Sequence, residues 1–399
     1  MRSVDVLVIG GGLVGCATAC RLAGTGASVE LIEASYLNAG ASGANAGSLH
    51  FQIERRFLEN GDALADQAAQ ILSLNRLAID EWRGLEAELG DSLHVHMRGG
   101  LMVAQTPQEV ALLEAKVARE TAGGLPSRLI DGEEARAIAP VLSQSIVAAS
   151  YLESEGHADP KALTLAFAAE AERQGARLSL GARAVAARRV HDGYEITVET
   201  GRARSSIRAS KVLIAAGAWS GRMGELFNLH LPIFPVALLM NVTERAPPLI
   251  DQLIQHVGRR LSMKQAYAGN ILIGGGWPSR MRLDASGRFD PGQQADLIET
   301  SLRGNLAVAV DVAPQVGQLN LIRSWTAVTA VTADQLPLVG EVPQAPGVYV
   351  AAGGSAFTLG PTFARLLARQ ILDEPEDRLR LFSPARFSHL NSFMGMAGA

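Results

Sequence analysis

The residues best suited to binding a cofactor are the glycines of a short motif near the N-terminus. Gly10, Gly12 and Gly15 follow an apolar run at residues 4–9, and a helix is expected to begin within the motif. Gly10 permits a tight turn, Gly12 lets the backbone approach a pyrophosphate, and Gly15 lets the helix pack closely against the strand. The phosphates can then accept hydrogen bonds from free N–H groups at the start of the helix. This spacing predicts a dinucleotide site.

An acidic residue stands at the distance that such a site needs. Residues 28–33 form a second apolar strand that ends in Glu33, about 20 residues after the motif. There a carboxylate can accept hydrogen bonds from ribose hydroxyls. The alternative is a glycine turn with only a structural role. The strand, helix, second strand and terminal acid together favour dinucleotide binding.

Two further glycine-rich segments favour FAD over a nicotinamide cofactor. Residues 211–220 are an apolar strand that ends in small residues, and residues 353–361 are a glycine-rich loop that leads into a helix. A nicotinamide enzyme is expected to stop after the first unit. Three glycine loops, each after an apolar strand, instead fit one long ligand that is contacted at several points. We therefore expect FAD.

Few other residues have the types and spacing of a catalytic site. His50 and Gln52 follow the small, polar loop of residues 36–50, and alternation places both on one side of an extended segment. This pair can hold a carboxylate or steer an amine; alternatively, His50 only supports the loop. Lys264 can supply a positive charge to a substrate, or it is a solvated lysine.

No other reaction centre is evident. We find no Ser/His/Asp triad and no pair of carboxylates, so we expect none. His94 and His96 are spaced as two ligands on one strand face, but no carboxylate or cysteine cluster accompanies them, so we expect no metal site. Cys16 and Cys20 are the two cysteines, too few for a disulfide framework or for an iron–sulfur cluster held by this chain alone.

The elements that must position these residues alternate between strands and helices. We expect a helix over residues 63–89, a strand pair around Gly99 and Gly100, a helix that opens at Pro160 and a last buried strand at residues 347–352. This order predicts an α/β fold. A doubly wound, Rossmann-like FAD-binding domain is interleaved with an α+β substrate domain that contains a mixed antiparallel sheet.

The chain is expected to pass between the two domains several times. We assign residues 1–90, 150–220 and 330–375 to the FAD-binding domain, residues 91–149 and 221–329 to the substrate domain, and residues 376–399 to a C-terminal arm. The substrate pocket is expected between the domains, at the exposed face of the flavin ring.

Length and composition bound the class of protein. The 399 residues allow two or three domains and a large core. With 48% hydrophobic and 19% charged residues and a formal net charge of -4, the chain is neither disordered nor a nucleic-acid-coating protein. No apolar run reaches about 18 residues, and the first strand starts almost at once. We therefore expect no transmembrane segment, no signal peptide and a cytoplasmic location.

Several motifs together carry a family resemblance that spans nearly the whole chain. They are the first glycine motif, the loop at 42–47, Gly-His-Ala-Asp-Pro at 156–160, the strand end at 215–220, Asp-Gln-Leu-Pro-Leu-Val-Gly at 334–340 and the last glycine loop. The chain resembles the D-amino acid oxidase-like flavoproteins, the class that holds glycine oxidase and sarcosine oxidase. Residues 45–52 and 271–278 look most like one branch of this class. It holds the β subunits of octopine and nopaline oxidases (opine dehydrogenases), D-hydroxyproline dehydrogenase and hydrogen cyanide synthase.

The resemblance implies contacts with FAD in all the glycine loops. The residues concerned are Gly10, Gly12, Leu13, Val14, Gly15, Glu33, Ala34, Ser42, Asn45, Ala46, Gly47, Ser48, Val185, Ala216, Gly217, Trp219, Gly354, Ser355, Phe357, Thr358 and Leu359. Some relatives attach flavin through a cysteine at the position of Ala327, so we expect non-covalent FAD here.

Two positions depart from the oxidases that the chain resembles. Sarcosine and glycine oxidases bind the substrate carboxylate with an arginine five residues before the aspartate of the Asp-x-x-Pro-x-x-Gly motif, where this chain has Thr329. Sarcosine oxidase places an oxygen-activating lysine at the position that corresponds to Leu272. Recognition of the carboxylate must therefore use other donors, for which we name His50, Gln52 and Lys264.

The resemblance also implies an activity. It is the FAD-dependent oxidation of a secondary amine or imino acid, such as an opine, hydroxyproline or proline, with hydride passing to flavin N5. The chain is then the catalytic β subunit of a hetero-oligomeric dehydrogenase whose α and γ partner subunits carry further redox cofactors, such as FMN and an iron–sulfur cluster. Two alternatives stay open: a stand-alone, oxygen-dependent oxidase of the glycine or sarcosine type, and a non-catalytic FAD subunit that relays electrons.

Overall fold

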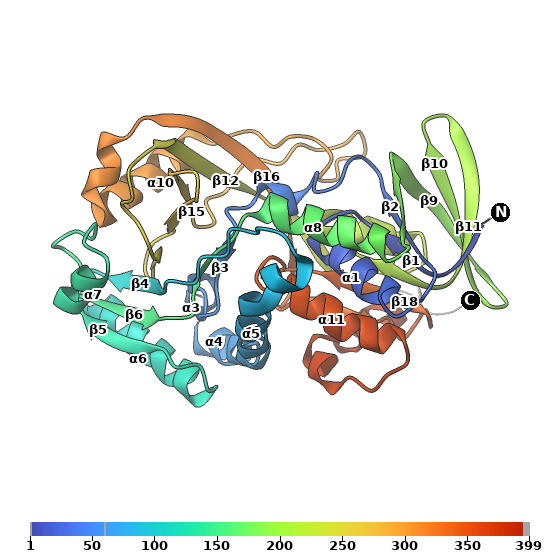
Figure 1. Ribbon diagram of the computed structural model, residues 1–399, viewed down its shortest axis with the longest axis horizontal. Coiled ribbons are helices and arrows are strands. Elements are labelled where there is room, and N and C mark those ends of the chain that lie inside the picture. The colour runs from blue at the N-terminus through green and yellow to red at the C-terminus, as the bar shows by residue number, and fades with distance from the viewer. Residues whose placement is uncertain (1, 60, 394–399) are drawn as a thin grey trace. The chain divides into compact units, whose positions relative to one another are not determined.

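The computed structural model describes residues 2–59 and 61–393, which divide into two compact units (Figure 1). Unit 1 comprises the described residues of Met1–Ala44, Pro160–Val236 and Val328–Ala399, and unit 2 those of Asn45–Asp159 and Ala237–Ala327. Each unit is built on a large sheet with helices packed against it. The predicted fold class, α/β with mixed sheets, is confirmed.

The compact units and the predicted domains are divided at different residues. Residues 45–90 lie in unit 2, whereas residues 221–236 and the described part of the C-terminal arm lie in unit 1. Two of the divisions fall inside long strands, β12 (Ile233–Arg245) and β16 (Leu321–Thr332). A boundary inside a strand leaves no loop or linker composition in the sequence, so pattern analysis has no signal for it.

The sheet of unit 1 has a parallel core. Its main strand order is β17-β18-β11-β1-β2-β8, in which every neighbouring pair from β18 to β8 is parallel. These strands are β1 (Arg2–Ile9), β2 (Val29–Glu33), β8 (Arg177–Leu180), β11 (Ala203–Ile214), β17 (Leu338–Glu341) and β18 (Val348–Ala352). The central strands are nearly continuous apolar runs because both of their faces are buried.

Different layers cover the two faces of this sheet. Helices α1 (Leu13–Ala23), α8 (Pro160–Arg173) and α11 (Gly360–Ile371) lie together on one face (Figure 1). On the other face, Leu7 and Ile9 pack with inward-facing residues of β9 (Ala182–Val190) and β10 (Gly193–Thr200), which join the sheet through the long β11. Strands, rather than a second layer of helices, therefore cover this face.

The sheet of unit 2 has the strand order β16-β12-β15-β14-β13-β4-β6-β5. Its shorter strands are β4 (Gly100–Ala104), β5 (Arg128–Asp131), β6 (Ala148–Leu152), β13 (Leu253–His256), β14 (Ser262–Gln265) and β15 (Asn270–Gly274). One face, which includes Met263 and Ile273, packs on α7 (Gly132–Ile138) and α10 (Glu299–Val312). On the other face, α6 (Pro107–Ala122) packs over β4 through Met102 and Leu113.

Two local predictions need correction. The helix expected over residues 63–89 is two helices, α4 (Asp62–Ala69) and α5 (Leu72–Leu89). Of the strand pair expected around Gly99, only β4 forms, and His96 makes an isolated bridge to His157. The remaining elements are α2 (Ala41–Ala44), β3 (Ser48–Leu49), α3 (Arg55–Leu58), β7 (Gly156–His157), α9 (Ser220–Glu225), α12 (Ser388–Phe393) and the 3-10 turns η1 (Gly217–Trp219), η2 (Pro314–Gln318), η3 (Asp377–Phe382) and η4 (Pro384–Phe387).

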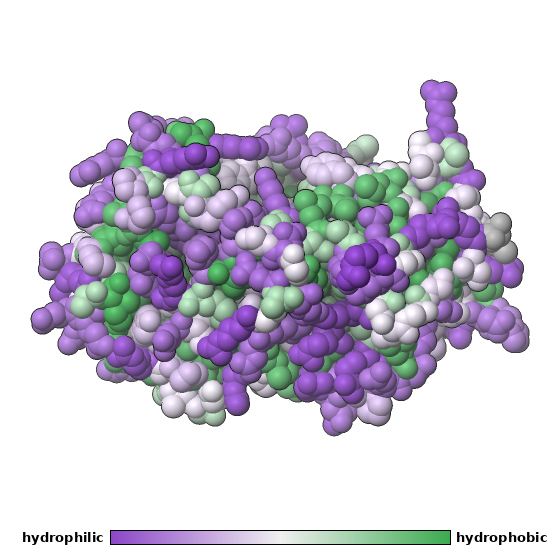
Figure 2. Space-filling view, viewed as in Figure 1, coloured by the Kyte–Doolittle hydropathy of each residue, from purple (hydrophilic) through white to green (hydrophobic). Residues whose placement is uncertain are grey.

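Within the described residues, no helix is both long and apolar enough to cross a membrane. The face of the molecule in Figure 2 is largely hydrophilic, and its hydrophobic residues form small, separate patches.

Candidate functional site

Four of the segments for which we predict cofactor contacts follow the carboxyl ends of adjacent parallel strands in unit 1. Gly10 follows β1, Ala34 follows β2, Ala215 follows β11 and Gly353 follows β18. Because these strands are neighbours in the order β18-β11-β1-β2, their carboxyl ends form one edge of the sheet. Ligands of open α/β sheets bind at this edge.

The first glycine motif is packed too closely to admit side chains. A Cβ atom added to Gly10 would lie 2.5 Å from the carbonyl oxygen of Ala215, and one added to Gly15 would lie 2.0 Å from the carbonyl oxygen of Gly10. Gly10 also has a φ of 121°, which favours glycine. At Gly12, the nearest atom to an added Cβ is Ser42 Oγ, at 3.0 Å. A side chain at position 12 would therefore crowd Ser42 beside the start of the helix.

The start of α1 and the end of β2 add polar groups to this edge. The helix begins at Leu13 without a side-chain cap on the preceding residue, and the Leu13 N–H donates to Ser42 Oγ at 3.0 Å. The Glu33 carboxylate accepts from the N–H groups of Gly11 and Ser35, each at 2.8 Å. A carboxylate has about four acceptor positions, so Glu33 can still accept from ribose hydroxyls.

The other two glycine segments are part of the same region of unit 1. A Cβ atom added to Gly360, the first residue of α11, would lie 3.0 Å from the side chain of Leu13. The loop at 353–359 therefore ends beside the start of α1. In the segment after β11, the ring of Trp219 lies 3.6 Å from the position of a Cβ on Gly40. Side chains added at Gly10, Gly15 and Gly360 would meet neighbouring atoms, whereas Gly217 has open space around it. The close-packed backbone therefore forms a cradle around the start of α1, and this fits the pyrophosphate of FAD.

Val185 lies in a bulge of β9. In the ladder between β9 and β10, Ala186 pairs with Thr197 and Ala184 pairs with Val198, so Val185 is skipped. A bulged residue leaves its backbone groups outside the ladder, where they can contact a base. The structure places the remaining predicted FAD contacts of unit 1 in three segments: Val14 in the first turn of α1, Ala216 and Gly217 at the start of η1, and Gly354, Ser355, Phe357, Thr358 and Leu359 in the loop before α11.

The predicted contacts at residues 45–48 belong to unit 2. Asn45 Oδ1 accepts from the Gly47 N–H at 2.6 Å, and Gly47 has a φ of 74°. Ser48 follows in β3 and pairs with His157 of β7. This loop, which also contains Ala46, leads directly to the candidate substrate residues that begin at His50.

Lys264 is buried, so the prediction of a solvated lysine is wrong. It lies in β14 with 2% of its surface exposed, and its Nζ donates to the carbonyl oxygen of Ala158 over a long 3.4 Å. Burial lowers the pKa of Lys264 to about 7, although the negative charge of Asp159 acts in the opposite direction. Buried lysines with lowered pKa values are typical of functional sites.

The sheet face that carries Lys264 also carries apolar residues. Lys264 pairs with Leu272 of β15, and Leu272 pairs with Val242 of β12. Directly paired residues share a face of the sheet. Leu272 and Val242 are half-buried, whereas Met263 and Ile273 on the opposite face belong to the core against α10. Lys264 therefore stands at one end of a half-buried apolar row.

The pairing of Lys264 with Leu272 bears on whether the reduced enzyme reacts with oxygen. A lysine stands one strand away from Leu272, on the same face, although position 272 itself has none. Lys264 can therefore place a positive charge near position 272, where sarcosine oxidase has its lysine. Leu272 alone is no argument against reaction with oxygen.

His50 is close to this face. Its Nε2 is 3.4 Å from Oγ of Ser262, which lies two residues before Lys264 on the same strand face. Burial lowers the pKa of His50; the charges of Arg56 and Lys264 lower it further, and Glu54 opposes them. His50 is therefore expected to be neutral, with one ring nitrogen as donor and the other as acceptor.

Gln52 has a different role from the predicted one. It is 2% exposed, and its Oε1 accepts from Lys116 Nζ and Ser150 Oγ, each at 2.7 Å. Its Nε2 donates to Glu155 Oε2 at 2.7 Å. Both ends of the amide are therefore used inside unit 2. We conclude that Gln52 supports its segment and does not face a substrate.

Gln52 belongs to a group of buried polar residues that sequence analysis missed. We call this group the buried polar cluster; its members are Gln52, Lys116, Glu120, Ser150 and Glu155, all at most 2% exposed. Lys116 Nζ lies 2.8 Å from Glu120 Oε1 in an ion pair between neighbouring turns of α6. Burial raises the pKa of Glu155 to about 7, against the hydrogen bonds from Gln52 and the charge of Lys116, which lower it.

The two carboxylates of the buried polar cluster bind the backbone that follows His50. Glu155 Oε1 accepts from the N–H groups of residues 51 and 52, both at 2.8 Å, and Glu120 Oε1 accepts from the N–H of residue 53 at 2.6 Å. Asn75 Nδ2 donates to the carbonyl oxygen of residue 51 at 2.7 Å. Side chains, rather than a neighbouring strand, therefore satisfy this extended segment.

His94 and His96, which have the spacing of two metal ligands, lie beside other rings in the structure. In residues 2–59 and 61–393, no three His, Cys, Asp or Glu side chains are grouped to hold a metal ion. His94 stacks on Tyr267 with ring centroids 3.6 Å apart, and the His96 ring lies 5.2 Å from that of His157. Burial lowers the pKa of His157, so this ring is expected to be uncharged.

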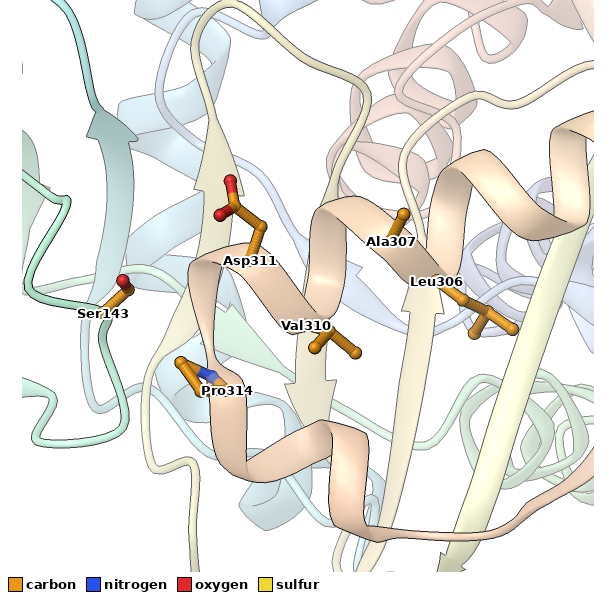
Figure 3. Close-up of a pocket in the computed structure, with 6 residues that line it drawn as sticks. All are labelled: Ser143, Leu306, Ala307, Val310, Asp311 and Pro314. Atoms are coloured by element: carbon orange, nitrogen blue, oxygen red, sulfur yellow. The ribbon is translucent and has the colours of Figure 1, made fainter.

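A separate hollow of about 620 Å³ opens beside α10 in unit 2 (Figure 3). Its lining residues are Ser143, Leu306, Ala307, Val310, Asp311 and Pro314. Asp311 forms an ion pair with Arg259 at 2.6 Å, and the other lining side chains are mostly apolar. Because α10 packs on the sheet face opposite Lys264, we do not assign this hollow to the substrate.

We expect FAD to be held without a covalent bond. Cys16 and Cys20 are both buried in α1, and burial is the main cause that raises the pKa of Cys16 to about 12. A protonated thiol is a poor nucleophile. Trichloroacetic acid should therefore release all of the yellow colour into the supernatant. Colour that stays with the precipitated protein would contradict this prediction.

Comparisons with known proteins find a matching family model, similar sequences and similar structures. The model of the family described as "FAD dependent oxidoreductase" (DAO) matches residues 5–370. An opine oxidase subunit of Rhizobium meliloti is 26% identical over 392 residues, which are 97% of this chain and 98% of the relative. The structure is similar to that of glycine oxidase from Geobacillus kaustophilus, with a TM-score of 0.82 and 24% identity over 97% of this chain and 99% of the other. It is also similar to L-proline dehydrogenase from P. horikoshii, with a TM-score of 0.81 and 23% identity over 97% and 98% of the two chains. At these identities the two structures establish the fold.

Proposed function

This chain belongs to the DAO family of FAD-dependent oxidoreductases, and from that membership we propose that it oxidises the C–N bond of a secondary amine or imino acid that carries a carboxylate. Its similarity to a protein named as an opine oxidase subunit supports a substrate of the opine type. Hydroxyproline and proline have the same combination of a secondary nitrogen and a carboxylate. We further propose that the chain is the catalytic β subunit of a hetero-oligomeric dehydrogenase.

The observation that carries the substrate proposal is the buried Lys264 beside the apolar row of Leu272 and Val242. A substrate carboxylate can accept a charge-assisted hydrogen bond from Lys264 Nζ, which otherwise has a long contact with the carbonyl of Ala158. The hydrocarbon part of the substrate can then pack against the row. Lys264 thus supplies the positive charge that Thr329 lacks, and His50 is the second candidate donor.

Lys264 can also accept a proton from the substrate. Its pKa is lowered to about 7, so at neutral pH a large share of the molecules carry an uncharged amine before substrate binds. A carboxylate bound beside Nζ favours the charged form. Lys264 therefore takes up a proton when the substrate binds. The substrate can supply this proton, because an amino acid zwitterion carries one on its own nitrogen. Transfer of the proton to Nζ leaves the substrate nitrogen neutral, as loss of hydride from the adjacent carbon requires.

Bound FAD supplies the electron acceptor of the reaction. In unit 1, Gly10, Gly12 and Gly15 would hold the pyrophosphate at the start of α1, and Glu33 would accept from the ribose. The segments at 216–219 and 353–359 would hold the rest of the cofactor. We propose these roles from the close packing of the glycines and from the common edge of the sheet.

The proposed partners follow from the name of the relative and from the cysteines. The relative is named as one subunit of an oxidase, which supports an assembly with other chains. We propose that the α and γ partner subunits carry FMN and an iron–sulfur cluster. The cluster is assigned to a partner because the two cysteines of this chain are buried and too few to hold it.

We expect the isolated chain to reduce an artificial dye with an opine or imino acid faster than it reduces oxygen. Dye reduction and oxygen consumption are measured on the isolated chain and on the chain co-expressed with its genomic neighbours. Peroxide formation at the dye-linked rate would instead identify a stand-alone oxidase. A flavin that no opine or imino acid bleaches in stopped flow would identify an electron-relay subunit.

A further inference from the structure

The segment after α11 is packed against unit 1. Leu379 and Phe382 of η3 are 1% and 0% exposed. Further along, the Asn391 side chain accepts a hydrogen bond from the His230 N–H at 2.7 Å. Between these anchors, η4 carries Arg386, whose side chain is 19% exposed. The described part of the C-terminal arm is therefore an integral part of unit 1.

The guanidinium of Arg386 binds one turn of the chain. Its Nε and Nη2 donate to the two carboxylate oxygens of Asp334, at 2.8 and 3.2 Å. Nη2 also donates to the carbonyl oxygens of Leu336, at 3.1 Å, and Pro337, at 2.9 Å. Nη1 donates to the carbonyl of Phe382 in its own segment at 2.7 Å. A planar guanidinium with five donors suits a carboxylate and several carbonyl groups at once, whereas an ammonium does not.

The turn at residues 334–337 has a backbone that needs support. Gln335 has a φ of 61°, which is uncommon for a residue other than glycine. The Leu336 N–H donates back to Asp334 Oδ1 at 3.2 Å, and Thr332 Oγ1 donates to the carbonyl oxygen of Leu336. Arg386 thus completes a set of hydrogen bonds that hold this turn.

The same turn touches the start of the last glycine loop. A Cβ atom added to Gly353 would lie 3.0 Å from Cα of Pro337 and 3.5 Å from the nitrogen of Leu338. Leu338 is also the ladder partner of Ala352, the residue before Gly353. A displacement of the turn must therefore displace the first residue of the loop at 353–359.

We propose that Arg386 is a positioning residue for FAD: by holding the turn at 334–337 it fixes the loop at 353–359 in the geometry that the cofactor contacts. The inference rests on the proposed role of this loop in FAD binding and does not depend on the substrate. The far end of the loop, at Gly360, packs on Leu13 at the start of α1. Order in the loop therefore also supports the neighbouring pyrophosphate cradle.

The test is a titration of the apoprotein with FAD, followed by quenching of the flavin fluorescence. Arg386→Gln should raise the Kd for FAD by about tenfold or more, because the charged hydrogen bonds to the turn are lost. Arg386→Lys keeps the charge but cannot reach the carboxylate and both carbonyl groups together, so its Kd should lie between those of the wild type and Arg386→Gln. The visible spectrum of the bound flavin should lose fine structure in the same order.

Three further variants separate positioning from general stability. Asp334→Asn should weaken FAD binding, and the double variant with Arg386→Gln should be no weaker than the worse single variant, because both act through one turn. Arg378→Gln is the matched control: it lies in the same arm but donates to Glu376, which Arg369 also contacts, so FAD affinity should stay within twofold.

A folded Arg386→Gln apoprotein that binds FAD as tightly as the wild type would overturn the proposal. If Arg386→Gln does not fold, the test uses Arg386→Lys and Asp334→Asn. Wild-type affinity for FAD in both of these variants would likewise overturn the proposal. Substrate is absent from the titration, so the result is independent of whether the enzyme oxidises an opine, an imino acid or neither.

Discussion

Replacement of Lys264 by methionine should lower kcat/KM by about tenfold to a hundredfold for a substrate that carries a carboxylate. A charged hydrogen bond is worth about 1.5–3 kcal/mol, and about 1.4 kcal/mol corresponds to a factor of ten. Methionine keeps a flexible apolar body, so β14 should retain its packing beside Leu272. The measurement is steady-state kinetics with a dye acceptor, at equal FAD content in the variant and the wild type.

Replacement of Lys264 by arginine separates binding of the carboxylate from transfer of the proton. In the wild type, the pKa of about 7 means that Lys264 is mostly charged at lower pH and cannot accept a proton. Wild-type kcat/KM should therefore increase as the pH rises through about 7. Arginine stays charged throughout this range and still binds a carboxylate. In Lys264→Arg, this increase should move to higher pH, toward the pKa of the substrate amine itself.

Lys161→Met is the control for both Lys264 variants, because Lys161 is exposed on α8 and should change kcat/KM by less than twofold. If Lys264→Met has the same kcat/KM as this control, Lys264 does not bind the substrate. In that case His50 is the remaining candidate for the carboxylate. A pH profile that is identical in the wild type and in Lys264→Arg would contradict proton transfer to Nζ.

The positions of the glycine segments in the fold were predictable because their signals are local in the sequence. Gly10, Gly12 and Gly15 follow their own strand directly, and Glu33 ends the next one. Each later glycine segment likewise follows the carboxyl end of a strand. Parallel neighbours then bring these ends together without any need to know the long-range contacts in advance.

The surroundings of the candidate substrate residues were less predictable because burial there depends on distant segments. Lys264 lies in a strand that reads Ser-Met-Lys-Gln, and its hydrogen bond to Ala158 joins it to a residue 106 positions earlier. Gln52 and Glu155 are 103 positions apart. One signal was present: Leu113, Lys116 and Glu120 have the spacing of a single helix face. A lysine and a glutamate on the buried face of a helix need buried partners, and the pattern could have predicted a polar cluster.

Replacement of Lys116 by methionine should destabilise the protein by about 3–5 kcal/mol, because it leaves one partner of a buried ion pair uncompensated. Lys116 and Glu120 are both 0% exposed, and Lys116 Nζ also donates to Gln52 at 2.7 Å and to Ser150 at 3.0 Å. Methionine fills a similar volume but donates no hydrogen bond. The free energy of unfolding is measured on the holoenzyme by urea denaturation.

A matched control on the same helix is Arg119→Met. Arg119 pairs with Asp62 and Asp66, whose side chains are 87% and 67% exposed, so its loss should cost about 1 kcal/mol or less. The double variant of Lys116→Met with Glu120→Gln removes both buried charges and should recover part of the lost stability, since an amide oxygen at position 120 can still accept from the backbone at residue 53. A Lys116→Met protein as stable as Arg119→Met would show that the ion pair does not support the fold. A loss that the double variant recovers would show that the buried charge left on Glu120 is the cause, and that the segment after His50 depends on this charge balance.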